Sequence, residues 1–389
     1  MPLNPALAAT FSPPVMEARR WLEGVTFPPD RPLLNLSQAA PVAPPPPALH
    51  AAMVDALSDP ATHLYGPVLG LPELRDTLAR QMQAQYGGTV SAAQIGITSG
   101  CNQAFCAAIT ALAGPGDSVI LPTPWYFNHA MWLSMQGIEA TPLPCNAALL
   151  PDPDHAAGLI TPRTRAIVLV SPNNPTGTEF PAPLIAAFRD LARARGIALI
   201  IDETYRDFLS HDAPPHDLFT DPDWDDTLIH LYSFSKAFRL TGHRVGAMAT
   251  SPARLAQIEK FLDTVTICPT TLGQRAALWG LQHLTEWLAG ERAEILRRRA
   301  AVQSGFAALD AWQLRSCGAY FAYVAHPFAR PSDTLAQDLV ARASLLVLPG
   351  TMFTPANDPS GARHLRIAYA NADAAGIADL TDRLRSFDR

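Results

Sequence analysis

Short apolar runs alternate with stretches of helical periodicity through the middle of the chain. In the run from Arg165 to Val170, for example, every residue after the arginine is apolar. Uninterrupted apolar strands are typical of a parallel sheet that is buried on both faces. We therefore expect an α/β fold in which helices cover both faces of a mostly parallel central sheet, a three-layer αβα sandwich. The expected strands are residues 93–99, 118–121, 165–170, 197–201, 228–233 and 245–249, and the expected helices are residues 49–57, 102–112, 127–135 and 182–194.

The same pattern divides the chain into three parts. A cluster of prolines between Pro41 and Pro47 favours extended backbone, so residues 1–45 are expected to form an arm that packs against the smaller domain. The alternating strands and helices place a large domain at residues 46–284. Beyond it, long helices and a mixed α+β segment predict a smaller C-terminal domain over residues 285–389.

Composition and charge limit the classes of function. The chain of 389 residues is 16% charged and carries a formal net charge of −6, which argues against nucleic acid as the main partner. We expect no membrane span, because no stretch approaches about 18 consecutive apolar residues. Residues 1–10 lack the basic and apolar regions of a signal peptide, so a cytoplasmic protein is expected. The five cysteines form no Cys-x-x-Cys pair and no Cys/His cluster, which indicates reduced thiols and no metal site.

Lysine is scarce in this chain. Lys236 and Lys260 are the two lysines, although Lys and Arg together number 29. Arginine cannot replace a lysine that attacks a carbonyl, because its guanidinium stays protonated. The sequence around Lys260 has helical spacing and predicts a solvated position. Lys236 follows an apolar strand and is a candidate Schiff-base nucleophile, and the scarcity of lysine weakens the alternative of a surface loop residue.

Two turns at strand ends could bind part of a ligand, because ligands of doubly wound sheets bind beyond the carboxyl ends of the strands. The turn from Ser99 to Asn102 leads through glycine into a helix whose free N–H groups can bind phosphate. By itself, this pattern is more often only a helix cap. The turn from Pro172 to Gly177 holds two asparagines between prolines, and is either a rigid binding turn or an ordinary tight loop.

Three further polar residues lie near strand ends. Asp202 follows an apolar strand, and a buried carboxylate there would need a cationic partner, unless Asp202 only caps the next turn. Tyr205 could reach the same site or be a core tyrosine. Arg244 precedes the last strand of the large domain, and its guanidinium matches either a phosphate or a surface carboxylate.

In combination, these motifs resemble the class I/II aminotransferases of fold type I, the aspartate aminotransferase superfamily, which use pyridoxal 5'-phosphate. The likeness is carried by Asn-Pro-Thr-Gly at 174–177, Asp-x-x-Tyr at 202–205, and Ser-x-Ser-Lys at 233–236 with Arg244 eight residues later. It runs from about Leu33 to the C-terminus. Four motifs in the right order make the resemblance highly specific.

The resemblance implies a role for each matching residue. Lys236 would bind the cofactor as a Schiff base and then carry a proton between the substrate Cα and the cofactor C4'. Asp202 would pair with the pyridinium nitrogen and keep it protonated. Tyr205 and Asn174 would hydrogen-bond the phenolic oxygen of the ring, and Asn174 would also help to orient the substrate. The phosphate would be held by backbone groups of Gly100, Cys101 and Asn102 and by the side chains of Ser233 and Arg244.

Three more matches extend the site. Tyr126 resembles the aromatic residue that stacks on the cofactor ring, with Trp125 as the competing choice and core packing as the simpler role for either. Tyr65 matches a tyrosine that reaches the phosphate of the neighbouring subunit, which implies a homodimer with shared active sites. Arg366 matches the arginine that binds the substrate α-carboxylate. Without the resemblance, Arg366 is better interpreted as an edge-strand residue with a surface partner.

Two departures from the family bear on the substrate. Where the family has a glycine near the substrate, this chain has Ala39 or a neighbouring residue, which narrows that side of the pocket. Between Val265 and Thr271 no arginine is available to bind a second carboxylate from across the dimer. A neutral, aromatic or sulfur-containing amino acid is therefore favoured over a dicarboxylic one.

The expected activity is ping-pong transfer of an amino group from an amino acid to a 2-oxo acid. A C–S β-lyase on the same fold is the alternative, and it would release pyruvate and ammonia from a thioether without an acceptor. A non-catalytic sensor is a third interpretation. Such regulators carry a DNA-binding module, and the proline-rich arm of roughly 45 residues contains no helix-turn-helix and no basic cluster.

Overall fold

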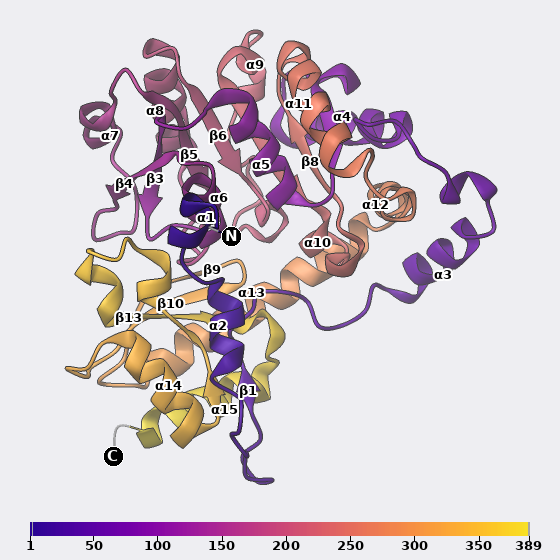
Figure 1. The fold of residues 1–389 in the computed structure, drawn as a ribbon. Coiled ribbons are helices and arrows are strands. Elements are labelled where there is room, and N and C mark those ends of the chain that lie inside the picture. Colours follow the sequence, from indigo (N-terminus) through magenta and orange to yellow (C-terminus); the bar gives the residue numbers. More distant parts are fainter. Residues whose placement is uncertain (2, 388–389) are drawn as a thin grey trace.

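The computed structural model describes residues 1 and 3–387, and within them a seven-stranded sheet forms the centre of the larger part of the molecule (Figure 1). The strand order is β2-β8-β7-β6-β5-β3-β4. Strand β8 runs antiparallel to both of its neighbours, and the other pairs are parallel, so the expectation of a mostly parallel sheet is confirmed. The strands are β2 (Ile95–Thr98), β3 (Ser118–Thr123), β4 (Glu139–Pro144), β5 (Thr164–Val170), β6 (Ala198–Asp202), β7 (Leu228–Ser233) and β8 (Gly246–Ala249).

Alternate residues of the central strands pack against opposite helical layers. In β5, Ile167 and Leu169 belong to a core that includes residues of α4, α8 and α12. Their neighbours Ala166 and Val168 belong to a second core, with residues of α5, α6 and α11. Apolar residues on both faces explain the uninterrupted runs, and the expected three-layer αβα sandwich is confirmed. The layers are α4 (Pro72–Tyr86), α8 (Ala182–Ala194) and α12 (Thr271–His283) on one face and α5 (Cys101–Leu112), α6 (Phe127–Met135) and α11 (Pro252–Thr266) on the other.

The sequence pattern did not predict strand β4. It lies at the edge of the sheet, contains Pro142 and Pro144, and pairs with β3 alone among the described strands. Proline is tolerated at an edge, where its missing N–H breaks no ladder. Because its side chains are mostly exposed or half-buried, β4 lacks the apolar run that marked the other strands.

A smaller α+β unit follows, built in the described residues on a four-stranded antiparallel sheet of order β12-β13-β10-β9. Val302, Leu335 and Leu380, from three helices, pack in one core with Val324 and Ile367 of this sheet. The elements are α13 (Thr285–Ala307), β9 (Gln313–Gly318), β10 (Phe321–Ala325), α14 (Ser332–Ala343), β12 (Leu348–Pro349), β13 (His364–Ala368) and α15 (Ala374–Phe387).

The N-terminal segment contacts both parts of the molecule (Figure 1). Thr10 follows α1 (Pro5–Ala9), and its Oγ1 lies 2.9 Å from Oγ of Ser134 in α6. Beyond α2 (Pro14–Arg20), strand β1 (Leu34–Asn35) pairs with β11 (Leu345–Leu346) of the smaller unit. The chain then passes Leu36, whose carbonyl accepts from Ala368 N–H at 2.9 Å. This course places residues 37–40 between the two sheets.

Four short or projecting helices complete the α-helices of the described residues. Helix α3 projects from the body of the molecule (Figure 1) and begins at Pro47, a first-turn position where proline costs no hydrogen bond. The helices are α3 (Pro47–Ala56), α7 (Pro153–Leu159), α9 (Trp224–Thr227) and α10 (Phe234–Ala237). Over the residues that the structure describes, no helix combines the length and the hydropathy needed to cross a membrane.

Candidate active site

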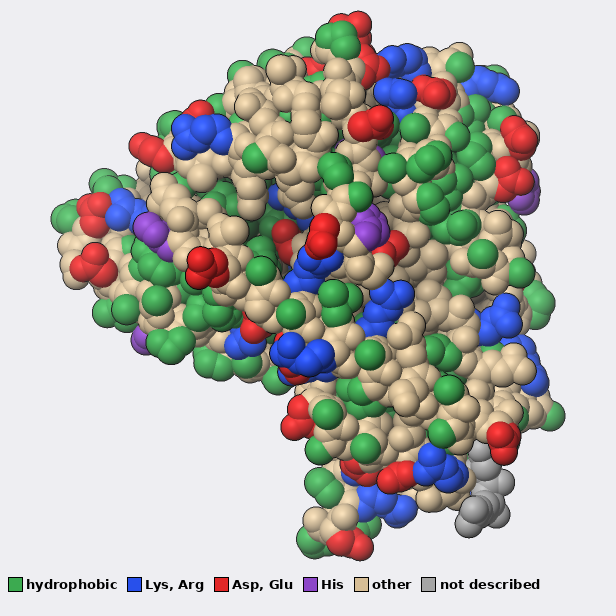
Figure 2. Space-filling model, turned by 180° about the vertical axis from the view of Figure 1, so that it is seen from behind, with side chains coloured by type: hydrophobic (Ala, Val, Ile, Leu, Met, Phe, Trp, Pro, Cys, Tyr) green, Lys and Arg blue, Asp and Glu red, His purple; other side chains and the backbone are tan. Residues whose placement is uncertain are grey.

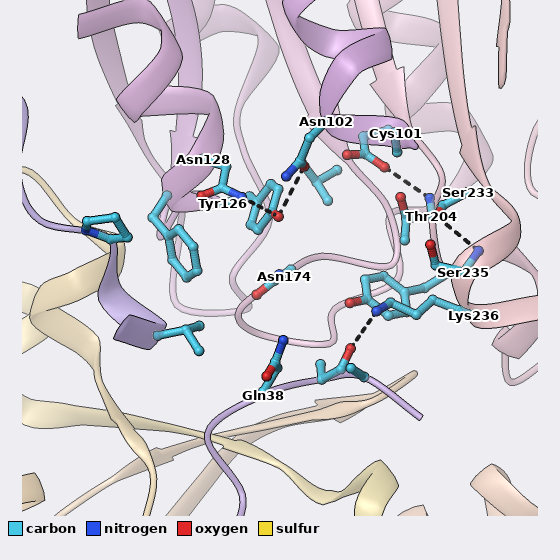
Figure 3. A pocket seen from close by; sticks show the side chains of 18 of the residues that line it. Gln38, Cys101, Asn102, Tyr126, Asn128, Asn174, Thr204, Ser233, Ser235 and Lys236 are labelled. Carbon is cyan, nitrogen blue, oxygen red and sulfur yellow. Dashed lines mark hydrogen bonds between the residues drawn. The ribbon is translucent and has the colours of Figure 1, made fainter. Parts of the chain in front are cut away.

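A cavity of about 390 Å³ lies where the carboxyl ends of β5, β6 and β7 face the N-terminal segment (Figure 3). Chain topology explains its position, because parallel strands end at one edge of the sheet and their connecting turns leave a crevice there. The sequence-predicted residues that line this cavity are Ala39, Cys101, Asn102, Tyr126, Asn174, Asp202, Tyr205, Ser233, Lys236, Arg244 and Arg366.

Lys236 lies in the single-turn helix α10, directly after β7. Its Nζ donates a hydrogen bond to the carbonyl of Ala39 at 2.7 Å (Figure 3). Burial, together with the positive charges of Arg244 and Arg366, lowers the pKa of Lys236 to about 8. A substantial fraction of this amine is therefore neutral and nucleophilic near neutral pH. Lys260 lies on the exposed face of α11 and donates to Gln257, away from the cavity.

Asp202 ends β6 and is 4% exposed. Its Oδ1 accepts from Thr204 N–H at 3.0 Å, and its Oδ2 lies 3.4 Å from Nε2 of His129, a contact longer than a well-formed hydrogen bond. Burial alone would raise the pKa of Asp202, but His129 and Thr204 outweigh this effect and lower it. The Phe105 ring stacks on His129 at a centroid distance of 3.9 Å. The cavity thus contains an ionised carboxylate suited to a protonated ring nitrogen.

His129 was not identified from the sequence. It lies in α6, and nothing in the linear pattern joins this helix to the end of β6. The signal that could have led to His129 was the inference that a buried Asp202 needs a cationic partner.

Arg366, on β13, is 2% exposed, so the surface interpretation of this residue is wrong. Its Nη1 donates to Asn174 Oδ1 at 3.1 Å, and its Nη2 donates to the carbonyl of Ser37. Burial lowers the pKa of Arg366 to about 10. Within the described residues, Nε has no hydrogen-bond partner. A buried guanidinium with unused donor capacity at a cavity suits a carboxylate ligand.

Two tyrosines line the cavity. The hydroxyl of Tyr126 donates to Asn102 Oδ1 at 3.2 Å and accepts from Asn128 Nδ2 at 2.8 Å (Figure 3). Burial, with the nearby charge of Asp202, raises the pKa of Tyr126 to about 12. Tyr205 is 5% exposed, and burial raises its pKa as well. Both phenols are therefore neutral donors.

Trp125, the competing candidate for the stacking aromatic, does not reach the cavity. Its side chain is buried in the core formed by residues of α5, α6 and α11. The geometry therefore favours Tyr126 over Trp125.

The start of α5 and Arg244 together form a cradle for an anion. Gly100 has a φ of +88°, and a Cβ at this position would lie 2.1 Å from Nη2 of Arg244. Arg244 Nη1 donates to Ser235 Oγ at 3.4 Å, and Ser233 Oγ accepts from Ser235 N–H at 3.3 Å. In the first turn of α5 the N–H of Gln103 donates to the carbonyl of Gly100 at 3.1 Å, whereas among the described residues the N–H groups of Cys101 and Asn102 have no backbone acceptor. Guanidinium, hydroxyls and a helix N-terminus are the donor set that binds phosphate.

Ser235 belongs to this cradle but was not singled out from the sequence. Its place in Ser-Phe-Ser-Lys, directly before Lys236, was the signal that could have found it. Two predicted site residues do not line the cavity: Gly100 adjoins Arg244 at the cradle, and Tyr65 lies apart from the cavity with a side chain that is 80% exposed.

The cavity therefore combines three features: a partly neutral amine, a buried carboxylate and an anion cradle. These residues fit the aldehyde, the ring nitrogen and the phosphate of pyridoxal phosphate, respectively. The buried Arg366 adds a site for a substrate carboxylate at the same cavity.

Comparison with known proteins agrees with this geometry. The family described as "Aminotransferase class I and II" matches residues 31–384. The chain is 30% identical over 363 residues to a protein of Mycobacterium tuberculosis named "Valine--pyruvate aminotransferase", covering 91% of this chain and 89% of that protein. It is 28% identical over 338 residues to "Aromatic aminotransferase ISS1" of Arabidopsis thaliana, covering 84% of this chain and 82% of that protein.

Solved structures show the same fold. The aspartate aminotransferase of Thermus thermophilus, solved with maleate, superposes with a TM-score of 0.89 at 26% identity and covers 99% of each chain. Members of the matched family use pyridoxal phosphate to move amino groups. The sequence motifs, the cavity and the matched family therefore agree that this chain belongs to the class I and II aminotransferases, which are pyridoxal-phosphate-dependent enzymes.

Proposed function

We propose that this aminotransferase takes the amino group from a neutral, aromatic or sulfur-containing amino acid and passes it to a 2-oxo acid. The observation that carries the proposal is the apolar part of the cavity wall, formed by Val15, Met16 and Phe127. Apolar side chains gain free energy when they leave water against such a wall. Ala39, 9% exposed, narrows the same cavity where the family has a glycine.

The proposed roles of the residues follow from their positions. Pyridoxal phosphate, when bound, withdraws electrons from the substrate Cα. Asp202 would hold a proton on the ring nitrogen, and Lys236 would accept and return the proton of the substrate Cα. Arg366, whose Nη1 lies 3.1 Å from Asn174 Oδ1, would bind the α-carboxylate together with Asn174. The two residues would so set the orientation of the Cα–H bond. Tyr205 would donate to the phenolic oxygen, and Tyr126 would stack on the ring.

Absorption spectroscopy and a substrate panel test this proposal. Wild-type protein with added cofactor should show a visible absorption band that Lys236→Ala lacks. A panel of neutral, aromatic, sulfur-containing and acidic amino donors, each with several 2-oxo acids, should show highest kcat/KM for the first three classes. Pyruvate and ammonia released from a thioether amino acid without any 2-oxo acid would instead support the β-lyase. If acidic donors react fastest, the substrate proposal is refuted.

We also propose a homodimer in which Tyr65 enters the partner's site. Support comes from its exposure and from the exposed apolar residues Leu64, Val265 and Ile267. These residues lie in two segments that meet where Gly66 N–H donates to Cys268 Sγ at 3.3 Å. Figure 2 shows hydrophobic side chains over the projecting lobe that carries α3. Large exposed apolar groups are frequent at subunit interfaces.

Mixing two defective variants tests the shared site. In a hybrid of Lys236→Ala and Tyr65→Ala subunits, one site would regain both wild-type residues. Activity of the refolded mixture should therefore exceed that of either variant alone. A monomer in light scattering, or no gain on mixing, would refute the shared site. Limited proteolysis would test the proposed domain limits at residues 45 and 284.

A further inference from the structure

The hydroxyl of Tyr126 lies between two asparagine side chains that come from different helices (Figure 3). It donates to Oδ1 of Asn102, in the first turn of α5, at 3.2 Å. It accepts from Nδ2 of Asn128, in the first turn of α6, at 2.8 Å. A phenol has one proton to donate, so the acceptor on Asn102 and the donor on Asn128 define both the position of the hydroxyl and the direction of its proton.

Both asparagines stand between the active-site cavity and a smaller cavity. They line the space of about 390 Å³ described above and also a neighbouring space of about 170 Å³, whereas Tyr126 lines the first of the two. The wall of the smaller cavity is mostly apolar and includes Phe105, Met131 and Met135. Without the two amides, the tyrosine hydroxyl would face a space with little to bind it.

Ring contacts add a second constraint on Tyr126. Its centroid lies 5.0 Å from that of His129, with an interplanar angle of 81°, and 5.2 Å from that of Phe127. Such contacts favour one relative orientation of two rings. The hydrogen bonds at the hydroxyl therefore fix the long axis of the tyrosine ring, and the perpendicular contact with His129 fixes its rotation about that axis.

Asn102 also connects Tyr126 to the anion cradle. Its backbone N–H belongs to the first turn of α5, where among the described residues it has no backbone acceptor. Its side chain reaches the tyrosine hydroxyl. One residue thus links the group that would bind the phosphate with the ring that would stack on the cofactor.

We propose that Asn128 and the side chain of Asn102 are positioning residues, which hold the ring of Tyr126 in the orientation that stacks on pyridoxal phosphate. The inference rests on the proposed function, which gives Tyr126 its stacking role. Both asparagines act through the tyrosine hydroxyl. A ring that is already ordered before the cofactor arrives loses less conformational entropy on binding, so cofactor affinity depends on these two hydrogen bonds.

A double-mutant cycle on cofactor affinity tests the assignment. Asn128→Leu keeps the side-chain size and removes the donor, so the Kd of pyridoxal phosphate should rise about fivefold, as expected for one lost hydrogen bond. Tyr126→Phe keeps the ring and removes the hydroxyl, and should have an effect of similar size. Because both changes break the same contact, Asn128→Leu should cause no further loss in the Tyr126→Phe background. Asn102→Ala should be non-additive with Tyr126→Phe in the same way.

Visible circular dichroism of the bound cofactor provides a second readout. At saturating cofactor, the band of Asn128→Leu should be weaker than that of wild type, because a looser stacking ring holds the cofactor in a less defined orientation. Asn128→Gln keeps an amide donor and should restore part of the band. Gln136→Leu is the matched control, since Gln136 ends the same helix and lines neither cavity.

The outcomes separate this inference from the proposed function. Equal losses from Asn128→Leu in the wild-type and Tyr126→Phe backgrounds, or an unchanged dichroism band, would overturn the positioning role. Tyr126→Ala removes the whole ring and should weaken binding more than Tyr126→Phe. If Tyr126→Ala weakens binding and Tyr126→Phe does not, stacking stands and positioning by the asparagines is refuted. If Tyr126→Ala leaves the Kd unchanged, the stacking role in the proposed function fails as well.

Discussion

In protein freed of cofactor, Lys236 should lose its proton near pH 8. Its pKa falls from 10.5 to about 8 because the ammonium group is buried and faces the positive charges of Arg244 and Arg366. At about pH 7.5, roughly a quarter of such an amine is neutral, against about one in a thousand for a lysine with the ordinary value. The structure therefore predicts a gain of roughly 200-fold in reactive amine.

The scarcity of lysine makes this gain measurable. Short pulses of acetic anhydride over a range of pH acetylate neutral amines, and mass spectrometry reports the two lysine peptides separately. Lys260, exposed on α11, is the internal reference for reagent concentration. The acetylation rate of Lys236 should rise with pH and level off with a midpoint near 8, so its excess over the rate of the exposed Lys260 should be largest below pH 8 and shrink above it.

Removing one of the neighbouring charges tests the cause. Arg244→Gln should raise the midpoint of Lys236, because one cation that opposes protonation is gone. Arg275→Gln is the control, since Arg275 pairs with Asp59 outside the cavity. A wild-type midpoint at or above about 10, or a midpoint that Arg244→Gln leaves unchanged, would refute the reasoning.

The same shift makes stability depend on pH. A lysine with a lowered pKa destabilises the folded state fully below pH 8, where both states are protonated, and this cost disappears as pH rises from 8 to 10.5. The shift corresponds to at most about 3 kcal/mol. Urea unfolding of the apoprotein should show that Lys236→Met removes this rise in stability and that Lys260→Met keeps it. If the stability of the wild-type apoprotein instead fell as pH rises from 8 to 10.5, the protonated amine would lie in a favourable environment.

Three further substitutions have defined outcomes. Gly100→Ala would place a Cβ 2.1 Å from Arg244 Nη2 at a φ of +88°, so cofactor affinity measured by fluorescence titration should fall at least about tenfold with circular dichroism unchanged. His129→Leu removes a group that lowers the pKa of Asp202, so burial should raise the pKa of that carboxyl. The acid limb of the pH–kcat profile should then move to higher pH, and an unmoved limb would contradict this. Arg366→Lys loses bidentate binding, so KM for every amino donor should rise about 10- to 100-fold while the spectrum of bound cofactor stays the same.

The central sheet could be predicted because its strands are apolar on both faces. The runs of β5, β6 and β7 needed no information from elsewhere in the chain. Strand β4 could not be found in this way, because an edge strand with prolines and exposed side chains has no distinctive pattern. Strand β4 is recognised from its pairing with β3, and this pairing is defined only in the folded chain.

Some residues of the candidate site could likewise be predicted from local sequence patterns, and others could not. Lys236, Asp202 and Asn174 could be predicted because each directly follows a recognisable strand or lies in a distinctive motif, and strand ends converge in this topology. His129 and the carbonyl of Ser37 could not, since each meets the site through contacts between elements far apart in sequence.

The sequence by itself determined the fold class and the cofactor chemistry, and it proposed the amine that carries this chemistry, because these depend on local patterns and on residue types that have no substitute. The tertiary structure decided how that amine and its neighbours are tuned. Burial and opposing charges lower the pKa of Lys236, His129 keeps Asp202 ionised, and the arm brings Met16 and Ala39 to the cavity. Such effects depend on distance and on exclusion of water, and only the folded chain defines either of them.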